Sequence, residues 1–355
     1  MRTDESDRAD VDWFIFLAGA GLLLAVALPI VLAPAWSAAV IDATFDFITH
    51  RLGIVYIVVA ASTLAFLLWV AMGRWGRIVL GGDGRPPAHS RFSWAAMLFC
   101  TGIGASLVYW GATEWVYYYL APPFGAAPRS DEAIVWAASY GIFHWGPIGW
   151  ALYCLPALAL GCSYHLREVP ALRLSAACAP VLGRLANGWL GRVIDLLFII
   201  GLLGTAATGL GFGISVVASA VTQLTGVADG FPLQASLIVL VSMIIAVSVY
   251  RGLDRGIKVL STFNAVLAIV LVGFVLLAGP TTFILESGVM ALGTVLQNFV
   301  RMTTWTDPMG SSDFVESWTI FYWAWWIALG PFVGMFVCKI SEGRTIRELI
   351  FGMLG

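Results

Sequence analysis

Four tryptophans and a tyrosine crowd residues 317–326, SWTIFYWAWW, inside an apolar run that continues to residue 337. On a helix, most large side chains of this run share one face about 100° wide: Trp318, Tyr322, Trp325, Trp326, Leu329 and Val333. Trp323 points elsewhere. An aromatic face at mid-membrane serves either helix packing or a cage for a cation without N–H donors. Aromatic faces attract a quaternary ammonium by about 0.5–2 kcal/mol each and require no hydrogen bond.

A second aromatic group occupies residues 143–153, FHWGPIGWALY. Trp145, Trp150 and Tyr153 fall within about 140° of one another on a helix. Pro147 frees a backbone carbonyl in the same turn. The adjacent His144 has two interpretations, a proton carrier or a side chain hydrogen-bonded between helices.

A third group begins with TGIGAS at residues 101–106, where a simple membrane span would carry leucine or valine. Such a segment is able to unwind, and irregular backbone at membrane depth is tolerated where it lines a cavity or is buried in protein. Broken helices there offer carbonyls and helix ends to ions and substrates. The alternative is close packing of helices through small residues. One carboxylate, Glu114, lies among the many aromatic residues that follow, which favours the functional interpretation.

These groups must be positioned by membrane helices, because the 355-residue chain is 60% hydrophobic and only 11% charged. This composition indicates an all-α polytopic membrane protein rather than a soluble domain. Eight apolar runs are long enough to cross about 30 Å of hydrocarbon: residues 13–34, 53–73, 93–120, 134–163, 193–225, 232–250, 259–285 and 316–338. Residues 286–315 are expected on the outside, as an ordinary loop or with a short helix on the membrane surface.

The distribution of basic residues predicts the orientation. With the N-terminus in the cytoplasm, every lysine and arginine except Arg51, Arg129 and Arg301 falls on the inside, which is 16 of the 19 in the chain. The positive-inside rule therefore favours a cytoplasmic N-terminus. The acidic first residues lack the basic start of a cleaved signal peptide, so the first span is expected to remain.

Several other functions are disfavoured. The five cysteines form no CxxC pair and no histidine cluster has ligand spacing, so neither disulfides nor a metal site are inferred. The sequence has no HExxH motif, no GxSxG on a suitable turn and no pair of intramembrane carboxylates. An intramembrane enzyme is therefore not expected. An ion channel would need a polar pore ring instead of an occluding aromatic cage, and saturable uptake against single-channel current separates the two.

The combined pattern resembles the betaine/choline/carnitine transporter family. Its signature, Gly/Ser/Asp/Asn-Trp-Thr-aliphatic-x-Phe/Tyr-Trp-x-Trp-Trp, is met in full by residues 317–326. Supporting matches lie at residues 102–114, 144–153, 252–261, 279–281 and 340–347. The resemblance implies secondary transport of quaternary-ammonium solutes across the cytoplasmic membrane by alternating access. It also implies twelve helices with two inverted repeats, usually assembled as a homotrimer, and no nucleic-acid partner.

The resemblance also implies site residues. It places the cation cage on Trp145, Trp150, Tyr153, Trp323, Trp325 and Trp326. A substrate carboxylate would meet backbone N–H groups near the broken third span, with further substrate contacts at Gly102, Gly104 and Tyr109. No organic cofactor is expected. The candidate ligands of a coupling ion, Na⁺ or H⁺, are Ile103, Ser106, Thr205, Thr208 and Phe332.

Departures from the family pattern bear on the subtype. Sodium-coupled betaine carriers resemble GMGIG where this chain has GIGAS at residues 102–106, which argues against sodium coupling of that kind. Residues 109–111 and 117–125 are more similar to the carnitine/γ-butyrobetaine exchangers. Those exchangers dispense with sodium through an arginine and a methionine, at positions that match Asn264 and Val333 here. Leu329 replaces a common aromatic and makes the cage more open.

The resemblance divides the chain into four parts. Residues 1–92 form an N-terminal segment with two peripheral spans, residues 93–285 the first inverted repeat, residues 286–315 the outer connection, and residues 316–355 the start of the second repeat. About eight of twelve expected helices are then present, so we expect a fragment or truncated product of a longer carrier. Residues 1–355 alone are expected to show no substrate counterflow. The alternative function is a non-transporting remnant or sensor of the same family.

Overall fold

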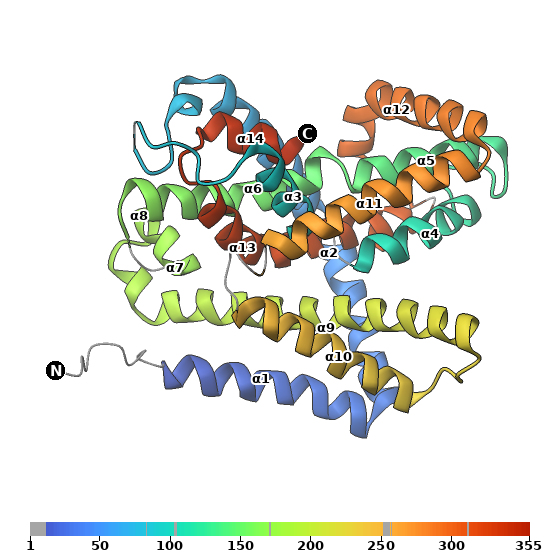
Figure 1. The fold of residues 1–355 in the computed structure, drawn as a ribbon, viewed down its shortest axis with the longest axis horizontal. Helices are drawn as coiled ribbons and strands as arrows, with labels where there is room; N and C mark the ends of the chain where they lie inside the picture. Colours follow the sequence, from blue (N-terminus) through green and yellow to red (C-terminus); the bar gives the residue numbers. More distant parts are fainter. Residues whose placement is uncertain are drawn as a thin grey trace.

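The computed structural model describes residues 12–82, 84–102, 105–169, 172–250, 256, 258–310 and 312–355. These residues form helices joined by short connections (Figure 1), which confirms the predicted all-α fold. The longer helices are α1 (Trp13–Leu32), α2 (Pro34–Met72), α9 (Trp189–Thr225), α10 (Phe231–Tyr250), α11 (Lys258–Ala278), α12 (Thr281–Thr304) and α13 (Phe321–Ile340). The shorter ones are α3 (Arg91–Gly102), α4 (Ala105–Leu120), α5 (Asp131–His144), α6 (Pro147–Gly161), α7 (Leu174–Ala177), α8 (Ala179–Leu182) and α14 (Ile346–Leu354).

Short helical segments of other types connect these helices. The 3₁₀ segments are η2 (Arg74–Arg77) and η4 (Gly183–Asn187), and the π-helical segments are η3 (Cys162–Leu166) and η6 (Val315–Ile320). The η6 segment leads directly into α13, so the aromatic run at 317–326 begins in a π-helical turn. Such turns are frequent at functional sites.

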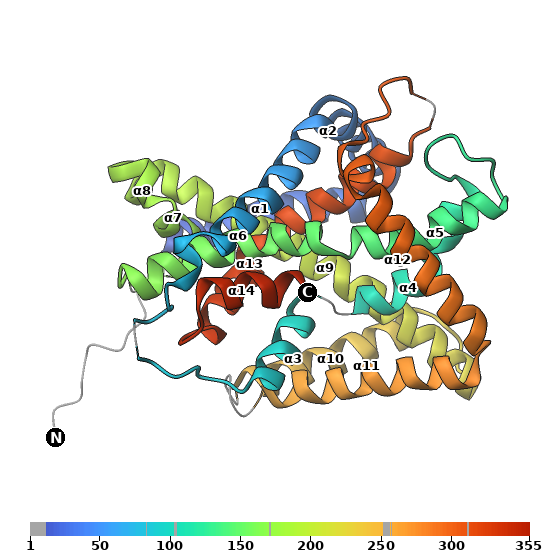
Figure 2. The same cartoon turned by 90° about the horizontal axis from the view of Figure 1, so that it is seen from above.

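Eight helical segments in the described residues are long and apolar enough to cross a membrane: 13–32, 34–72, 131–166, 189–225, 231–250, 258–278, 281–304 and 315–340. The number of candidate spans equals the predicted eight, but the two sets of spans do not contain the same segments. The predicted third span, 93–120, consists of the two shorter helices α3 and α4. Helix α12 takes its place in the count, although only a loop or short surface helix was expected there. Figure 2 shows α12 turning away steeply from the end of α11.

Helix α2 is longer than any membrane requires. Its 39 residues extend about 58 Å at 1.5 Å per residue, against about 30 Å of hydrocarbon. It includes residues 35–52, which the hydropathy pattern placed between two spans. Pro34 occupies the first turn, where its missing N–H costs nothing, and no second proline interrupts the helix.

Helices α6 and α13 pack closely and form the centre of the core. Small residues permit this approach, as expected for membrane helices. A Cβ at Gly334 would lie 2.8 Å from the backbone nitrogen of Ala157, and one at Gly330 would lie 3.1 Å from the carbonyl oxygen of Leu152. On another side of the molecule, α1 and α10 pack against α9 (Figure 1).

The connection after α2 is tied to the connection after α13. The N–H of Leu80 donates to the carbonyl of Arg344 at 2.9 Å, and the N–H of Gly343 donates to the carbonyl of Leu80 at 2.8 Å. The guanidinium of Arg344 lies 4.5 Å from the ring centroid of Trp94. The indole N–H of Trp94 donates to Ser341 Oγ at 3.0 Å. Side-chain and backbone contacts thus join segments more than 240 residues apart in the sequence.

Candidate functional site

The aromatic side chains of α6 and α13 meet around Trp326. Its ring centroid lies 4.4 Å from that of Tyr153, 5.8 Å from Trp150 and 5.9 Å from Trp145. Trp325 joins the group at 6.3 Å from Trp145. We call Trp145, Trp150, Tyr153, Trp325 and Trp326 the cage. The structure brings together five of the six residues that the family resemblance implied.

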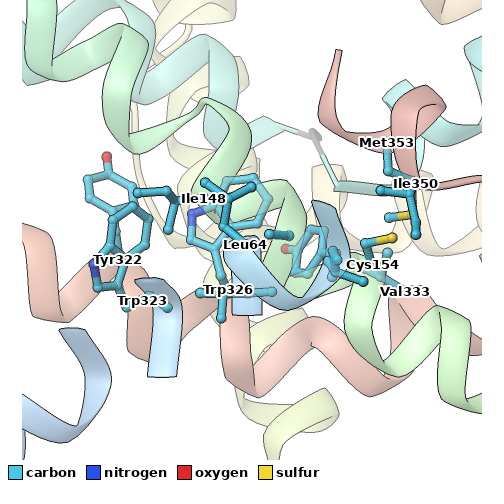
Figure 3. Packing of buried hydrophobic residues seen from close by; sticks show 14 of the residues in the cluster. Leu64, Ile148, Cys154, Tyr322, Trp323, Trp326, Val333, Ile350 and Met353 are labelled. Carbon is cyan, nitrogen blue, oxygen red and sulfur yellow. The ribbon is translucent and has the colours of Figure 1, made fainter. Parts of the chain in front are cut away.

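Local sequence explains how α6 and α13 place these rings. Trp145 caps the end of α5, and Pro147 starts α6 after the break at Gly146. Trp150 and Tyr153 follow on α6, three residues apart, so they lie on neighbouring turns. Gly149 leaves room for Trp326, because a Cβ there would come within 2.6 Å of the indole. Figure 3 shows Trp326 in the midst of the buried cluster, between Tyr322 on one side and Val333 on the other.

Trp323 lies apart from the cage. Its ring contacts Phe143 at 5.8 Å and His144 at 5.7 Å, on the side of α13 that packs against α5. Only 1% of Trp323 is exposed. The helical-face analysis separated Trp323 from its neighbours, whereas the family resemblance included it. The geometry agrees with the helical-face analysis, and a direct contact between Trp323 and a substrate stays a prediction.

A cavity of about 770 Å³ adjoins the cage. Trp145 and Trp150 line it, and so do Arg91, Arg344 and Glu348. The three charged residues belong to segments that the basic-residue pattern places on the cytoplasmic side. The cavity therefore connects two cage rings with the predicted cytoplasmic face.

A buried carboxylate holds one wall of the cage. Glu114 on α4 is only 4% exposed. Its Oε2 accepts hydrogen bonds from the indole N–H of Trp145 at 2.9 Å and from the hydroxyl of Tyr322 at 2.8 Å. Its Oε1 accepts from the hydroxyl of Tyr118 at 2.5 Å. The sequence singled out Glu114 as a lone carboxylate among aromatics but did not reveal these partners, of which only Tyr118 is near in sequence.

His144 extends this network to η6. Its Nδ1 lies 2.8 Å from the hydroxyl oxygen of Tyr118, and its Nε2 lies 3.1 Å from Thr319 Oγ1. When Tyr118 donates its single proton to Glu114, Nδ1–H donates to Tyr118, and in the neutral imidazole Nε2 then accepts from Thr319. His144 thus forms hydrogen bonds between helices, which is one of the two interpretations offered by the sequence.

Other predicted site residues lie away from the cage rings. Tyr109 stacks on Phe212 of α9 with ring centroids 4.8 Å apart. The hydroxyls of Thr205 and Thr208 donate to carbonyls one turn back on α9, at 2.7 and 2.9 Å. Phe332 is 39% exposed on α13. Their roles in binding a substrate or a coupling ion stay predictions.

Part of the predicted unwound segment, residues 101–106, lies outside the described residues. Gly102 is the last residue of α3, and Ser106 lies in the first turn of α4. Ile103 and Gly104 lie outside the described residues. Backbone contacts from this segment to a substrate or an ion therefore stay a prediction.

Comparison with known proteins decides the family. The model of the betaine/carnitine/choline family transporters, BCCT, matches residues 14–355. The chain belongs to this family. Among the similar BCCT proteins, a carnitine transporter of Acinetobacter baumannii is 35% identical over 341 residues. The high-affinity choline transport protein of Escherichia coli is 36% identical over 355 residues, and the glycine betaine transporter OpuD of Bacillus subtilis is 37% identical over 311 residues.

These alignments cover most of this chain but less of each BCCT relative. The alignment with the Acinetobacter baumannii protein covers 96% of this chain and 60% of that relative. The alignment with the Escherichia coli protein covers 98% of this chain and 51% of that relative, and the alignment with OpuD covers 87% and 60%. The chain thus spans between about half and three fifths of the relatives it matches. The three relatives have different named solutes at nearly equal identity, so overall similarity does not select one of them.

Proposed function

We propose that the full-length protein is a secondary transporter of quaternary-ammonium solutes, with the cation bound in the cage. Carnitine, glycine betaine, choline and close analogues share a trimethylammonium group, which has no N–H donor. Aromatic faces suit this group, and each contributes about 0.5–2 kcal/mol. The observation that carries the proposal is that the rings of Trp145, Trp150 and Tyr153 all contact the ring of Trp326.

A polar group for the remainder of the substrate is present beside the rings. The indole Nε1 of Trp325 is buried and has no hydrogen-bond partner among the described residues. A buried donor left unpaired costs about 1–3 kcal/mol. A substrate hydroxyl or carboxylate would accept from it. Backbone N–H groups near residues 102–105 are the second proposed contact for a carboxylate.

Transport would proceed by rocking one group of helices around the cage, with access alternating between the two sides. The N-terminus is proposed to lie in the cytoplasm, which places the cavity beside Trp145 and Trp150 on the inner side. A homotrimer and coupling to Na⁺ or H⁺ are further proposals from the family. The hydroxyls of Thr205 and Thr208 keep free lone pairs for an ion while they donate within α9.

Counterflow in proteoliposomes tests the function. Proteoliposomes that contain the full-length protein are loaded with unlabelled choline, glycine betaine or carnitine, and uptake of the labelled solute is followed with and without sodium and over a range of pH. Saturable counterflow of at least one solute is expected, with weak competition by 3,3-dimethylbutanol, the neutral isostere of choline. Absence of counterflow for all three solutes, or equal competition by the neutral isostere, would contradict the proposal. A rate independent of both sodium and pH would contradict ion coupling only.

A further inference from the structure

The carboxyl group of Glu114 lies directly behind the cage and is bonded to the cage ring of Trp145. Each donor that reaches it is uncharged: the hydroxyls of Tyr118 and Tyr322 and the indole N–H of Trp145. Three donated hydrogen bonds satisfy a carboxylate, whereas a carboxylic acid would need an acceptor for its own proton. We take Glu114 as ionised, the form in which its two oxygens accept all three of these hydrogen bonds.

No neighbouring cation neutralises this charge in the described part of the chain. No lysine or arginine there lies within 4 Å of Glu114, and the nearest basic atom is His144 Nδ1 at 4.0 Å from Oε1. His144 is fully buried and its two ring nitrogens meet only the hydroxyls of Tyr118 and Thr319, so a neutral imidazole satisfies both contacts. A cation in the cage would then be the counter-charge of Glu114.

We propose that Glu114 is the positioning residue of the cage and sets its preference for cationic over zwitterionic solutes. This inference rests on the proposed function. A choline-type solute carries only the positive charge, so it gains the full attraction of the carboxylate. A zwitterion such as glycine betaine carries its own carboxylate, which cancels part of that attraction.

The positioning role follows from where Trp145 lies. It stands at the break between α5 and α6, where the regular helix ends and the backbone constrains the ring less. The charge-assisted bond from Nε1 to Oε2 fixes the indole from a different helix. The same oxygen holds Tyr322, whose ring centroid is 5.6 Å from that of Trp145. Donation to an anion also polarises the indole and strengthens its attraction for a cation.

The substitution Glu114→Gln separates charge from shape. Glutamine keeps the side-chain size and an acceptor for Trp145 but removes the charge. Binding of choline and of glycine betaine to the full-length protein is measured by isothermal titration. We expect the choline affinity to fall about tenfold, as for the loss of a nearby charge in a partly screened site. The betaine affinity is expected to fall less than about threefold, so the ratio of the two affinities decreases.

The control is Glu132→Gln. Glu132 accepts the indole N–H of Trp136 at 3.2 Å, which is the same kind of bond at an exposed position outside the cage. Its substitution is expected to leave both affinities within about twofold of the wild type, the usual scale for an exposed bond. The inference would be overturned if Glu114→Gln left the ratio of choline affinity to glycine betaine affinity unchanged, or if Glu132→Gln changed this ratio equally.

A second variant keeps the test valid if Glu114→Gln does not fold. Tyr322→Phe retains the ring and removes one hydroxyl from the carboxylate, and it is expected to weaken both solutes about threefold, the usual value of one hydrogen bond. Unchanged affinities would overturn the positioning role. A wild type that binds neither solute overturns the proposed function and the inference together, whereas wild-type binding with an unchanged ratio overturns only the inference.

Discussion

The indole of Trp326 lies against the backbone of Gly149, so close that a Cβ at residue 149 would come within 2.6 Å of the ring. This contact joins α6 to α13 at the centre of the cage. It sets the depth at which Trp326 enters between Trp145 and Tyr153. The position of the Trp326 ring therefore depends on the absence of a side chain at residue 149.

The substitution Gly149→Ala tests this dependence. The added methyl group is expected to displace the Trp326 ring and to weaken quaternary-ammonium binding about tenfold, because overpacking a tight contact costs about 1–3 kcal/mol. Binding is measured by titration, with unfolding temperature as a check on stability. Gly141→Ala on α5 is the control, since a Cβ there meets nothing within 4 Å. Equal effects of the two substitutions would contradict the contact as a determinant of binding.

Trp326 and Trp323 are expected to differ in function. Trp326→Ala removes a cage ring that is 3% exposed, and loss of a desolvated aromatic anchor costs about 2 kcal/mol or more, roughly thirtyfold in affinity. Trp323→Phe preserves the packing against Phe143 and is expected to retain affinity within about threefold. Equilibrium binding to both variants is measured, with Trp69→Ala as the control, since Trp69 is 61% exposed and lies outside the cage. A large loss in Trp323→Phe alone would return that residue to the cage.

Arg344 is expected to stabilise the fold through its burial. It lies over Trp94, and its guanidinium donates to the carbonyl of His89 at 2.9 Å. Arg344→Ala removes both contacts and is expected to cost about 1–3 kcal/mol, seen as a lower unfolding temperature in detergent. Arg85→Ala breaks only an exposed ion pair with Glu342, which is worth about 0–1 kcal/mol. A stability loss at Arg85 as large as that at Arg344 would contradict this account.

The start of α14 makes stability depend on pH. The backbone N–H of Thr345 donates to Glu348 Oε2 at 2.9 Å and lowers the pKa of this carboxyl below its ordinary value. A lowered pKa in the folded state stabilises the fold above the unfolded pKa of about 4.3, and the contribution disappears as the pH falls through the folded value. Unfolding temperature should therefore drop less between pH 7 and pH 4 in Glu348→Gln than in the wild type. Because the Glu348 carboxyl is partly exposed, the difference in unfolding temperature between the wild type and Glu348→Gln is expected to be small. Parallel curves of unfolding temperature against pH for the two proteins would refute this role.

Most helices could be predicted because length and hydropathy suffice for a membrane span. Helix α12 was not expected as a candidate span because polar residues such as Glu286, Gln297 and Asn298 interrupt its apolar pattern. The continuity of α2 through residues 35–52 was missed for a related reason. Its acidic residues Asp42 and Asp46 lower the hydropathy but do not stop a helix.

Part of the site could be predicted from local periodicity. Trp326 and Trp325 share a helical face, and so do Trp150 and Tyr153, which lie close in sequence. The partners of Glu114 could not be predicted, because 208 residues separate it from Tyr322. Only the tertiary fold, in which α4 packs against α5, brings their polar atoms together. The family resemblance was also unable to supply this network, since it assigned rings and not the groups behind them.

The most direct test locates the cation itself. An arsonium analogue of choline, bound to crystals of the full-length protein, marks the cation through anomalous scattering from arsenic. The account predicts one strong peak within about 6 Å of the ring centroids of Trp145, Trp150, Tyr153 and Trp326, the range of cation–π contact. A peak at another site, with the cage empty at a saturating concentration of the analogue, would contradict it.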